Sequence, residues 1–396
     1  LALEGGGATS HTAVIAKSLG IPCVVGVEGL TRQVTPGDTV WVDGTRGVVV
    51  VNPDPETVRR ARSLGDRYER LEAVLLRESH LPAETLDGHR AVLLANVEYP
   101  MDVDAGIERG ATGVGLYRTE FLYDSKRGLP DEDEQVAIYR ATLGRLEGGR
   151  LTVRTFDFGA DKEMPRAGPP EPNPAMGLRS LRWCFANPDL FLAQLRALLR
   201  VAAEGDVRIM LPMVGSLEEL RRAKAMLRQA SRELATEGVP HRPDPPVGVM
   251  IEIPAAAVIA DLLAREADFF SIGTNDLIQY DLAVDRVNPQ VAGLFRPSHP
   301  SVLRLLQQVL EAAAEAGIPA SMCGEMGGHS IYAALLFGMG IREFSLTPGY
   351  VPRVRRLLRS LTLRRARSIA AQCLRLATAE EVEAHLHARV TPVGMG

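Results

Sequence analysis

The sequence predicts an α/β protein in which a small histidine-bearing domain, residues 1–52, is joined by a helical linker, residues 53–84, to a closed (β/α)8 barrel, residues 85–396. The barrel is predicted because eight short apolar segments alternate with helical patterns over roughly 300 residues. The small domain is predicted because the stretch GGGATSHTAVIAKSLGIPCVVG places glycines and a histidine before a helical pattern. An open doubly wound sheet is the main rival to the barrel, but no GxGxxG turn follows an early strand.

Residues 1–52 are predicted to form one helix and three strands. The helix spans about Thr12–Ser18, and the strands are PCVVGV (22–27), TVWVDG (39–44) and GVVVVN (47–52), separated by Gly, Pro and Asp turns. A charged helix with few apolar positions then runs from about Pro55 to Ser79, which favours a connector. The chain begins without an initiator Met, so we expect the small domain to be incomplete at its N-terminus.

The barrel region shows eight strand candidates and, between most of them, amphipathic helices. The strands are AVLLANV (91–97), GVGLY (113–117), LTVRTFDF (151–158), VRIMLPMV (207–214), VGVMIEI (247–253), DFFSIG (268–273), ASMCG (320–324) and REFSL (342–346). The clearest helices are 189–204, 216–236, 255–265, 301–316 and 329–339.

Composition narrows the class of protein. The chain is 46% apolar and 24% charged with a net charge of −4, which gives no reason to expect nucleic acid or an anionic membrane as a partner. Four scattered cysteines show no metal-ligand spacing and fit a reducing cytoplasm. No apolar run reaches membrane-spanning length, so we expect no membrane insertion and a cytoplasmic location.

Polar residues follow the carboxyl ends of the predicted strands, where a barrel of this kind holds its active site. The second strand is followed by Arg118, Thr119 and Glu120; the third carries Arg154, Asp157, Asp161 and Lys162; the fifth ends at Glu252; the sixth is followed by Asn275, Asp276 and Arg286; the seventh ends at Cys323, Gly324 and Glu325; and Asn173, Arg179 and Arg182 lie between the third and fourth.

These residue types suit a small, highly anionic substrate. Arginine offers planar paired donors that match phosphate and carboxylate oxygens. Glu252 and Asp276 are hard oxygen ligands of the kind that Mg²⁺ prefers. Any single arginine can equally be an ordinary salt-bridge partner, but several on predicted strand ends favour a site for phosphate and carboxylate groups.

Cys323 and His11 each allow two interpretations. Cys323 is either a buried structural thiol or, from its position at a strand end, a proton donor. His11 follows Thr9 and Ser10, either of which can cap the next helix, so its imidazole lies where a helix N-terminus favours an anion. A neutral imidazole there is a competent nucleophile, and the alternative is a histidine that merely occupies a glycine turn.

Eight motifs in order give the chain a strong resemblance to a known family. They are GGATSHTAVIAKSLGIP, GVGLYRTEFLY, RTFDFGADK, NPAMGLRSLR, MLPMV, IEIPAAA, SIGTNDLIQYDLAVDR and CGEMGG. The chain resembles Enzyme I of the bacterial sugar phosphotransferase system, the phosphoenolpyruvate–protein phosphotransferases, and the resemblance covers essentially all 396 residues.

The resemblance implies a role for each matched residue. His11 corresponds to the phosphorylated histidine of a swivelling domain, and Cys323 to the acid that protonates the departing enolate. The implied phosphoenolpyruvate ligands are Arg118, Arg154, Asn275, Asp276 and Arg286, and the implied Mg²⁺ ligands are Glu252 and Asp276. The family also implies a homodimer joined through its barrels and onward transfer of the phosphoryl group to the carrier protein HPr.

Three departures from the family pattern accompany the resemblance. Nothing in this sequence corresponds to the segment that docks HPr, so phosphorylation of His11 could survive while transfer to HPr fails. Ala8 stands where some relatives have Arg, which we expect to be tolerated, and His329 follows CGEMGG where an acidic residue is common.

Other functions stay open on the sequence alone. A dikinase that forms pyruvate from phosphoenolpyruvate with the ATP/AMP couple resembles the same two domains, although LYRTEFL and SHTAV favour Enzyme I. A catalytically inactive relative that binds phosphoenolpyruvate for regulation is disfavoured because every residue proposed to take part in the chemistry is present. A barrel-only lyase or aldolase leaves residues 1–52 unexplained.

Overall fold

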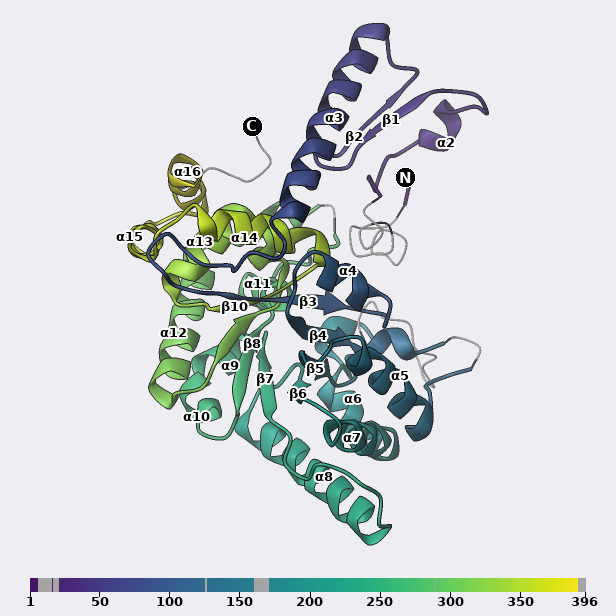
Figure 1. Ribbon diagram of the computed structural model, residues 1–396, viewed down its shortest axis with the longest axis vertical. Coiled ribbons are helices and arrows are strands. Elements are labelled where there is room, and N and C mark those ends of the chain that lie inside the picture. Colours follow the sequence, from purple (N-terminus) through teal and green to yellow (C-terminus); the bar gives the residue numbers. More distant parts are fainter. Residues whose placement is uncertain (6–15, 17–20, 125–126, 160–170, 289, 391–396) are drawn as a thin grey trace. The chain divides into compact units, whose positions relative to one another are not determined.

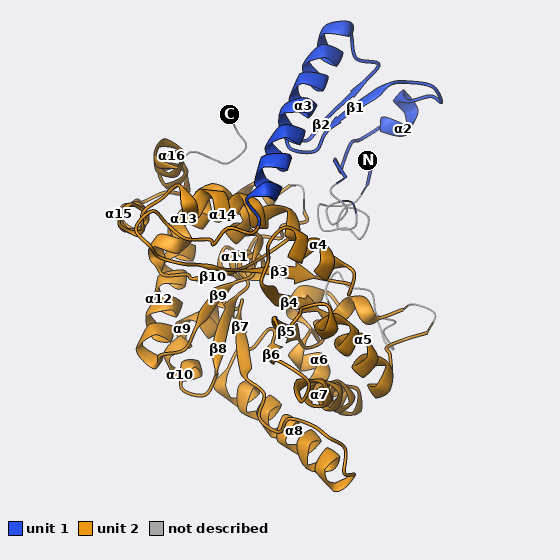
Figure 2. Cartoon of the chain, viewed as in Figure 1, with its two compact units in different colours: residues 1–79, 396 blue, residues 80–395 orange. Residues whose placement is uncertain are grey.

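The computed structural model describes residues 1–5, 16, 21–124, 127–159, 171–288 and 290–390 (Figure 1). The chain divides into two compact units, residues 1–79 and residues 80–395 (Figure 2). His11, Asp161 and Lys162 lie outside the described residues, as does the predicted helix at 12–18 except for Ala16.

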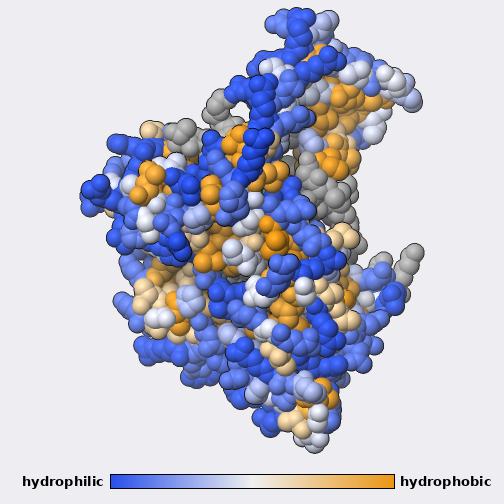
Figure 3. All heavy atoms as spheres, viewed as in Figure 1, coloured by the Kyte–Doolittle hydropathy of each residue, from blue (hydrophilic) through white to orange (hydrophobic). Residues whose placement is uncertain are grey.

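Unit 1, residues 1–79, contains an antiparallel hairpin and a long helix. The predicted strands at 39–44 and 47–52 are present as β1 (Val40–Asp43) and β2 (Val48–Val51), and they pair with Val40 opposite Val51. The other elements are the short helix α2 (Leu30–Gln33) and α3 (Pro55–Arg77), whose visible face is mostly hydrophilic (Figure 3). Asp54 caps α3 by accepting the Thr57 N–H at 2.7 Å, and the predicted charged helix is thereby confirmed.

The predicted strand at 22–27 is wrong. Val24 makes an isolated parallel bridge with Ala2, and no longer ladder forms around it. The physical reason is local: Pro22 has no N–H to donate, and Gly26 adopts a left-handed φ of 73°, which turns the chain away from an extended path.

Unit 2 is the predicted closed barrel of eight parallel strands, so the open-sheet alternative is excluded. The strand order is β10-β3-β4-β5-β6-β7-β8-β9. Their bounds are β3 (Val92–Val97), β4 (Gly113–Arg118), β5 (Arg150–Arg154), β6 (Val207–Leu211), β7 (Val247–Ile251), β8 (Phe269–Ile272), β9 (Ala320–Met322) and β10 (Glu343–Leu346). Five strands, β5 to β9, end earlier than predicted because the last predicted residues already belong to the segments that follow the strands on the carboxyl-terminal face.

Helices surround the barrel (Figure 1). They are α4 (Asp102–Glu108), α5 (Glu132–Gly144), α6 (Leu181–Ala186), α7 (Pro188–Ala202), α8 (Leu217–Thr236), α9 (Pro254–Val258), α10 (Ala260–Ala264), α11 (Thr274–Asp281), α12 (Pro300–Ala316), α13 (Ser330–Met339), α14 (Val351–Arg359), α15 (Leu363–Cys373) and α16 (Ala379–Arg389). The predicted single helix at 255–265 is wrong: Ile259, with φ −101° and ψ 23°, breaks it into α9 and α10.

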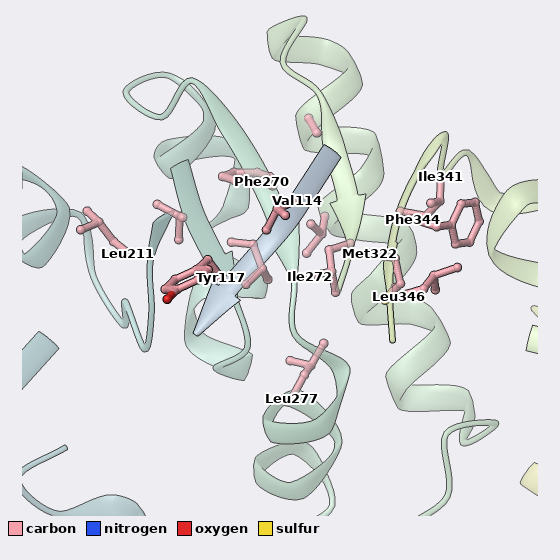
Figure 4. Close-up of a cluster of buried hydrophobic side chains, with 14 of the residues drawn as sticks. Val114, Tyr117, Leu211, Phe270, Ile272, Leu277, Met322, Ile341, Phe344 and Leu346 are labelled. Atoms are coloured by element: carbon pink, nitrogen blue, oxygen red, sulfur yellow. The ribbon is translucent and has the colours of Figure 1, made fainter. Parts of the chain in front are cut away.

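Apolar side chains fill two separate regions of unit 2. The larger core lies between strands and helices and includes Val114, Leu277 and Phe344 (Figure 4). A smaller cluster inside the barrel joins Met250 and Cys323 with residues of three further strands, namely Leu116, Met210 and Phe269. Because Cys323 follows β9, it lies at the carboxyl-terminal end of the barrel interior. Within the described part of the chain, no helix has the length and apolarity needed to cross a bilayer.

Candidate active site

Two arginines end neighbouring strands at the same level of the barrel. Arg118 on β4 and Arg154 on β5 are partners in the strand register, so their side chains start side by side on the carboxyl-terminal face. Arg118 donates to Glu98 Oε1 at 2.8 Å. Arg154 is 5% exposed and pairs with Glu120 and, at 3.1 Å, with Asp157.

The Arg154 guanidinium is strongly held in its charged form. Burial opposes that charge, but the carboxylates of Glu120, Asp157 and Glu252 outweigh burial and raise the pKa of Arg154. Its Nε–H is buried and has no hydrogen-bond partner among the described residues. Because an unsatisfied buried donor is costly, this N–H is suited to donate to an anionic ligand.

Arg179 links Asp157, which follows β5, to Asp276 on α11. Its guanidinium donates to both Asp157 oxygens, at 3.1 and 3.3 Å, and to both Asp276 oxygens, at 3.4 and 3.2 Å. It also donates to the Tyr280 hydroxyl at 3.0 Å. The next residue, Ser180, has a positive φ of 56°, which a non-glycine residue rarely adopts, so local strain accompanies this placement.

The sequence signal for Arg179 was present but weak, because it is one of several arginines near strand ends. Its neighbour Arg182 lies apart, exposed and donating to the Met176 carbonyl at 3.2 Å, and Asn173 is also exposed. Position in the motif NPAMGLRSLR alone could not separate the central arginine from the peripheral one.

Glu252 and Asp276 form the carboxylate side of the site. Glu252 follows β7, is buried, and its Oε1 accepts the Met213 N–H at 2.7 Å. A Cβ at Gly273 would lie 3.0 Å from Glu252 Oε2, so glycine there leaves room for the carboxylate. Asp276 lies in the first turn of α11 and also accepts from Arg286 at 3.3 Å.

The pKa values of the two carboxyl groups are shifted in opposite directions. Burial, with the charges of Asp276 and Asp157, raises the pKa of Glu252. For Asp276 burial acts in the same sense, but Arg179 and Arg286 outweigh it and lower the pKa. Glu252 is thus a buried carboxyl group with two further carboxylates near it.

This pair fits a divalent cation. Mg²⁺ is usually held by one or two carboxylates, with water and substrate phosphate completing its shell. A cation beside Glu252 would favour its ionised form, against the burial and the neighbouring carboxylates that raise its pKa. Within the described ranges, no cluster of three or more His, Cys, Asp or Glu side chains is arranged around a metal position, so substrate oxygens and water would have to complete the shell.

Cys323 follows β9, and its thiol donates to the Ile272 carbonyl at 3.4 Å. Burial raises the pKa of the thiol to about 11, so it holds its proton at neutral pH. The charges of Glu252, Arg154 and Arg118 also act on this thiol, which places the predicted residues around one point. Beside it, a Cβ at Gly324 would lie 1.9 Å from Thr274 Oγ1, so only glycine lets the two loops meet.

The remaining predicted residues lie around the same face. The Asn275 Oδ1 accepts the Glu325 N–H at 3.2 Å, which ties the loop after β8 to the loop after β9. The His329 ring lies 5.9 Å from the Tyr350 ring centroid. Glu98 and Tyr280 were not predicted. Glu98 follows β3 and belongs to none of the quoted motifs, whereas Tyr280 lies on α11 within SIGTNDLIQYDLAVDR, a signal that could have found it.

The fold is a (β/α)8 barrel whose carboxyl-terminal face gathers buried arginines and carboxylates, and comparison with known proteins gives the family. Residues 73–363 match "PEP-utilising enzyme, PEP-binding domain", and residues 1–47 match "PEP-utilising enzyme, mobile domain". The chain belongs to the PEP-utilising enzymes, and the predicted family is confirmed.

Curated relatives are similar over nearly the whole chain. Phosphoenolpyruvate-protein phosphotransferase of Staphylococcus carnosus is 43% identical over 378 residues, 95% of this chain, and that of Bacillus sp. (strain S) is 45% identical over 382 residues, 96% of this chain. The chain spans 66% of the length of each. Among solved structures, a citrate lyase from Burkholderia xenovorans LB400 matches with a TM-score of 0.43 at 17% identity, covering 78% of this chain and 94% of that one.

Proposed function

We propose that this chain transfers the phosphoryl group of phosphoenolpyruvate to His11, releasing pyruvate, as part of a phosphoenolpyruvate–protein phosphotransferase. The observation that carries the proposal is that two buried guanidinium groups, Arg154 and Arg179, and the protonated thiol of Cys323 lie at the carboxyl-terminal face of the barrel. The names of the curated relatives and the match to a PEP-binding domain support the same substrate.

In this proposal the arginines bind and orient the substrate. Arg118, Arg154 and Arg286 carry fixed positive charge for the carboxylate and phosphate oxygens, with Asn275 beside the phosphate and Asp276 facing Arg286. Arg179 does not need to touch the substrate, because its bonds to Asp157 and Asp276 already hold two of the surrounding carboxylates in place.

The proposed chemistry balances in two steps. An imidazole nitrogen of His11 attacks phosphorus, the N–P bond forms, and the bond from phosphorus to the enol oxygen breaks with its electron pair left on the enolate. The Cys323 thiol then gives its proton to the methylene carbon of the enolate, and the product is pyruvate. The high pKa of the thiol keeps that proton available at neutral pH.

Glu252 and Asp276 would hold Mg²⁺ in the proposed site. When bound, such an ion supplies positive charge that stabilises the transferring phosphoryl group and the enolate oxygen. The arrangement around it comes from this chain: the Met213 N–H fixes one Glu252 oxygen, while Arg179 and Arg286 hold Asp276 in its ionised form.

Further parts of the proposal concern the whole protein. Residues 1–52 would be the swivelling phosphohistidine domain and residues 53–84 its linker, with onward transfer to HPr and a homodimer joined through the barrels. A long charged helix such as α3 suits a connector between moving domains. We place the enzyme in the cytoplasm, in keeping with its four free cysteines.

We expect the chain, mixed with phosphoenolpyruvate and Mg²⁺ in a single turnover, to form pyruvate and protein-bound phosphate in equal amounts. Pyruvate is measured with a coupled dehydrogenase, and phosphate is followed with labelled substrate. Pyruvate without retained label would indicate hydrolysis and contradict the proposal. Removal of the label by added HPr would indicate onward transfer to that carrier, whereas removal by AMP with inorganic phosphate would indicate a dikinase instead.

A further inference from the structure

We propose that Gln194 is a positioning residue that fixes the ends of β4 and β5, and with them the arginines that bind the substrate; the catalytic part of this inference rests on the proposed function. Gln194 lies on α7, outside the barrel, and is 0% exposed. Its neighbours on the buried face of α7 are apolar, including Phe191 and Leu198. A carboxamide in such a position needs partners for both of its polar ends.

The two ends of the Gln194 carboxamide bind the two strand ends separately. Its Oε1 accepts the Phe156 N–H at 3.0 Å, and its Nε2 donates to Thr119 Oγ1 at 3.2 Å. The Thr119 hydroxyl in turn donates to the Arg154 carbonyl at 2.8 Å. A closed set of hydrogen bonds therefore joins β4, α7 and β5 directly beneath the site.

The residues that Gln194 binds, Thr119 and Phe156, are adjacent in sequence to charged residues of the site. Thr119 lies between Arg118 and Glu120, and Phe156 immediately precedes Asp157. Thr119 begins a short 3-10 helix, Thr119–Leu122, directly after β4. Because Arg118, Glu120 and Asp157 are bonded directly to Thr119 or Phe156 in the chain, fixing the backbone at these two residues also restricts where the flanking charged groups lie.

The strand ladder does not hold this backbone by itself. The register between β4 and β5 ends with the pair Arg118 and Arg154. The next N–H, that of Thr155, donates to Met210 on β6 at 2.9 Å, and the following one, that of Phe156, depends on Gln194. Without the carboxamide, this buried N–H loses its partner at the point where the site begins.

A matched control exists in the same cluster of hydrogen bonds. Gln194 Nε2 also donates to the Tyr139 hydroxyl at 3.3 Å, and that hydroxyl donates to Gln135 at 3.1 Å. Tyr139→Phe removes these two bonds and keeps the ring, which packs edge-on against Tyr117. It therefore perturbs the buried cluster but leaves both links from Gln194 to the strand ends.

The experiment compares Gln194→Leu with Tyr139→Phe in the full chain. Hydrogen exchange is followed in peptides that cover 116–122 and 152–158, and kcat and KM for phosphoenolpyruvate are measured separately. We expect Gln194→Leu to accelerate exchange in both peptides and to lower kcat/KM at least about tenfold, mainly through kcat, because small misplacements of binding groups are costly in the transition state. Tyr139→Phe should lower the Tm while leaving exchange at the strand ends and the kinetics unchanged.

Equal exchange and equal kinetics in the two variants would overturn the inference and leave Gln194 with a purely structural role. If Gln194→Leu does not fold, Thr119→Val tests the same link from the other side, and it must reproduce the faster exchange at 152–158. A wild-type chain that forms no pyruvate would contradict the proposed function, while the exchange data would still decide whether Gln194 positions the strand ends.

Discussion

Arg154→Leu is expected to abolish phosphoenolpyruvate binding and to lower the free energy of unfolding by about 3–5 kcal/mol, the range measured when one partner of a buried ion pair is removed. Arg154 is buried between Glu120 and Asp157, and leucine would leave both carboxylates without this cation in a site that water hardly reaches. The loss of the guanidinium also removes the buried Nε–H proposed to face the substrate.

Urea unfolding gives the free energy, and isothermal titration with phosphoenolpyruvate and Mg²⁺ gives the binding. The control is Arg182→Leu, since Arg182 is exposed and lies three residues after Arg179. A surface change of this kind is expected to alter stability by no more than about 0.5 kcal/mol. If Arg154→Leu bound substrate as tightly as the control, Arg154 would have no part in the site.

Cys323→Ala is expected to slow pyruvate formation by about 10²–10⁴-fold, the usual contribution of a positioned proton donor. Phosphoryl transfer to His11 should be affected less, because the thiol acts on the enolate after the bond to phosphorus has broken. Stability should change little, since alanine fills most of the space of a small buried thiol whose hydrogen bond to the Ile272 carbonyl is long, at 3.4 Å.

The matched control for this variant is Cys373→Ala. Cys373 is also buried and burial likewise raises the pKa of its thiol to about 11, but it lies on α15. Rapid quench with labelled substrate separates formation of phosphoprotein from formation of pyruvate. Equal rates of pyruvate formation in the two cysteine variants would remove Cys323 from the mechanism.

Sequence patterns predicted the barrel well because each strand is a short apolar run bounded by turn residues. The same logic failed at residues 22–27, where the apolar run is also short but Pro22 and the left-handed Gly26 prevent pairing beyond a single bridge. It failed again at Ile259, because helical periodicity continues across the break between α9 and α10 and carries no sign of the local change in backbone angles.

Site residues at strand ends could be predicted from the sequence. Residues whose role depends on contacts with distant parts of the chain could not. Arg118, Arg154, Glu252 and Cys323 could be found from strand ends and motifs, and the structure brings their charges around one point. Gln194 carries no such signal, because its importance comes from contacts with Thr119 and Phe156, both far away in the sequence.

The same holds for Arg179. It differs from Arg182 only in which way the chain turns at Ser180, and sequence spacing does not encode that turn. Long-range placement of this kind depends on packing of α6 and α7 against the strands, which no local pattern reveals.

The central claim, that phosphorus passes from phosphoenolpyruvate to His11, is tested most directly by mapping the label. Wild type, His11→Ala and the control His80→Ala, which changes an exposed histidine, are incubated with labelled phosphoenolpyruvate and Mg²⁺. Wild type and His80→Ala should acquire a label that is lost in acid and retained in base, and His11→Ala should acquire none. A label that persists in His11→Ala would contradict the account.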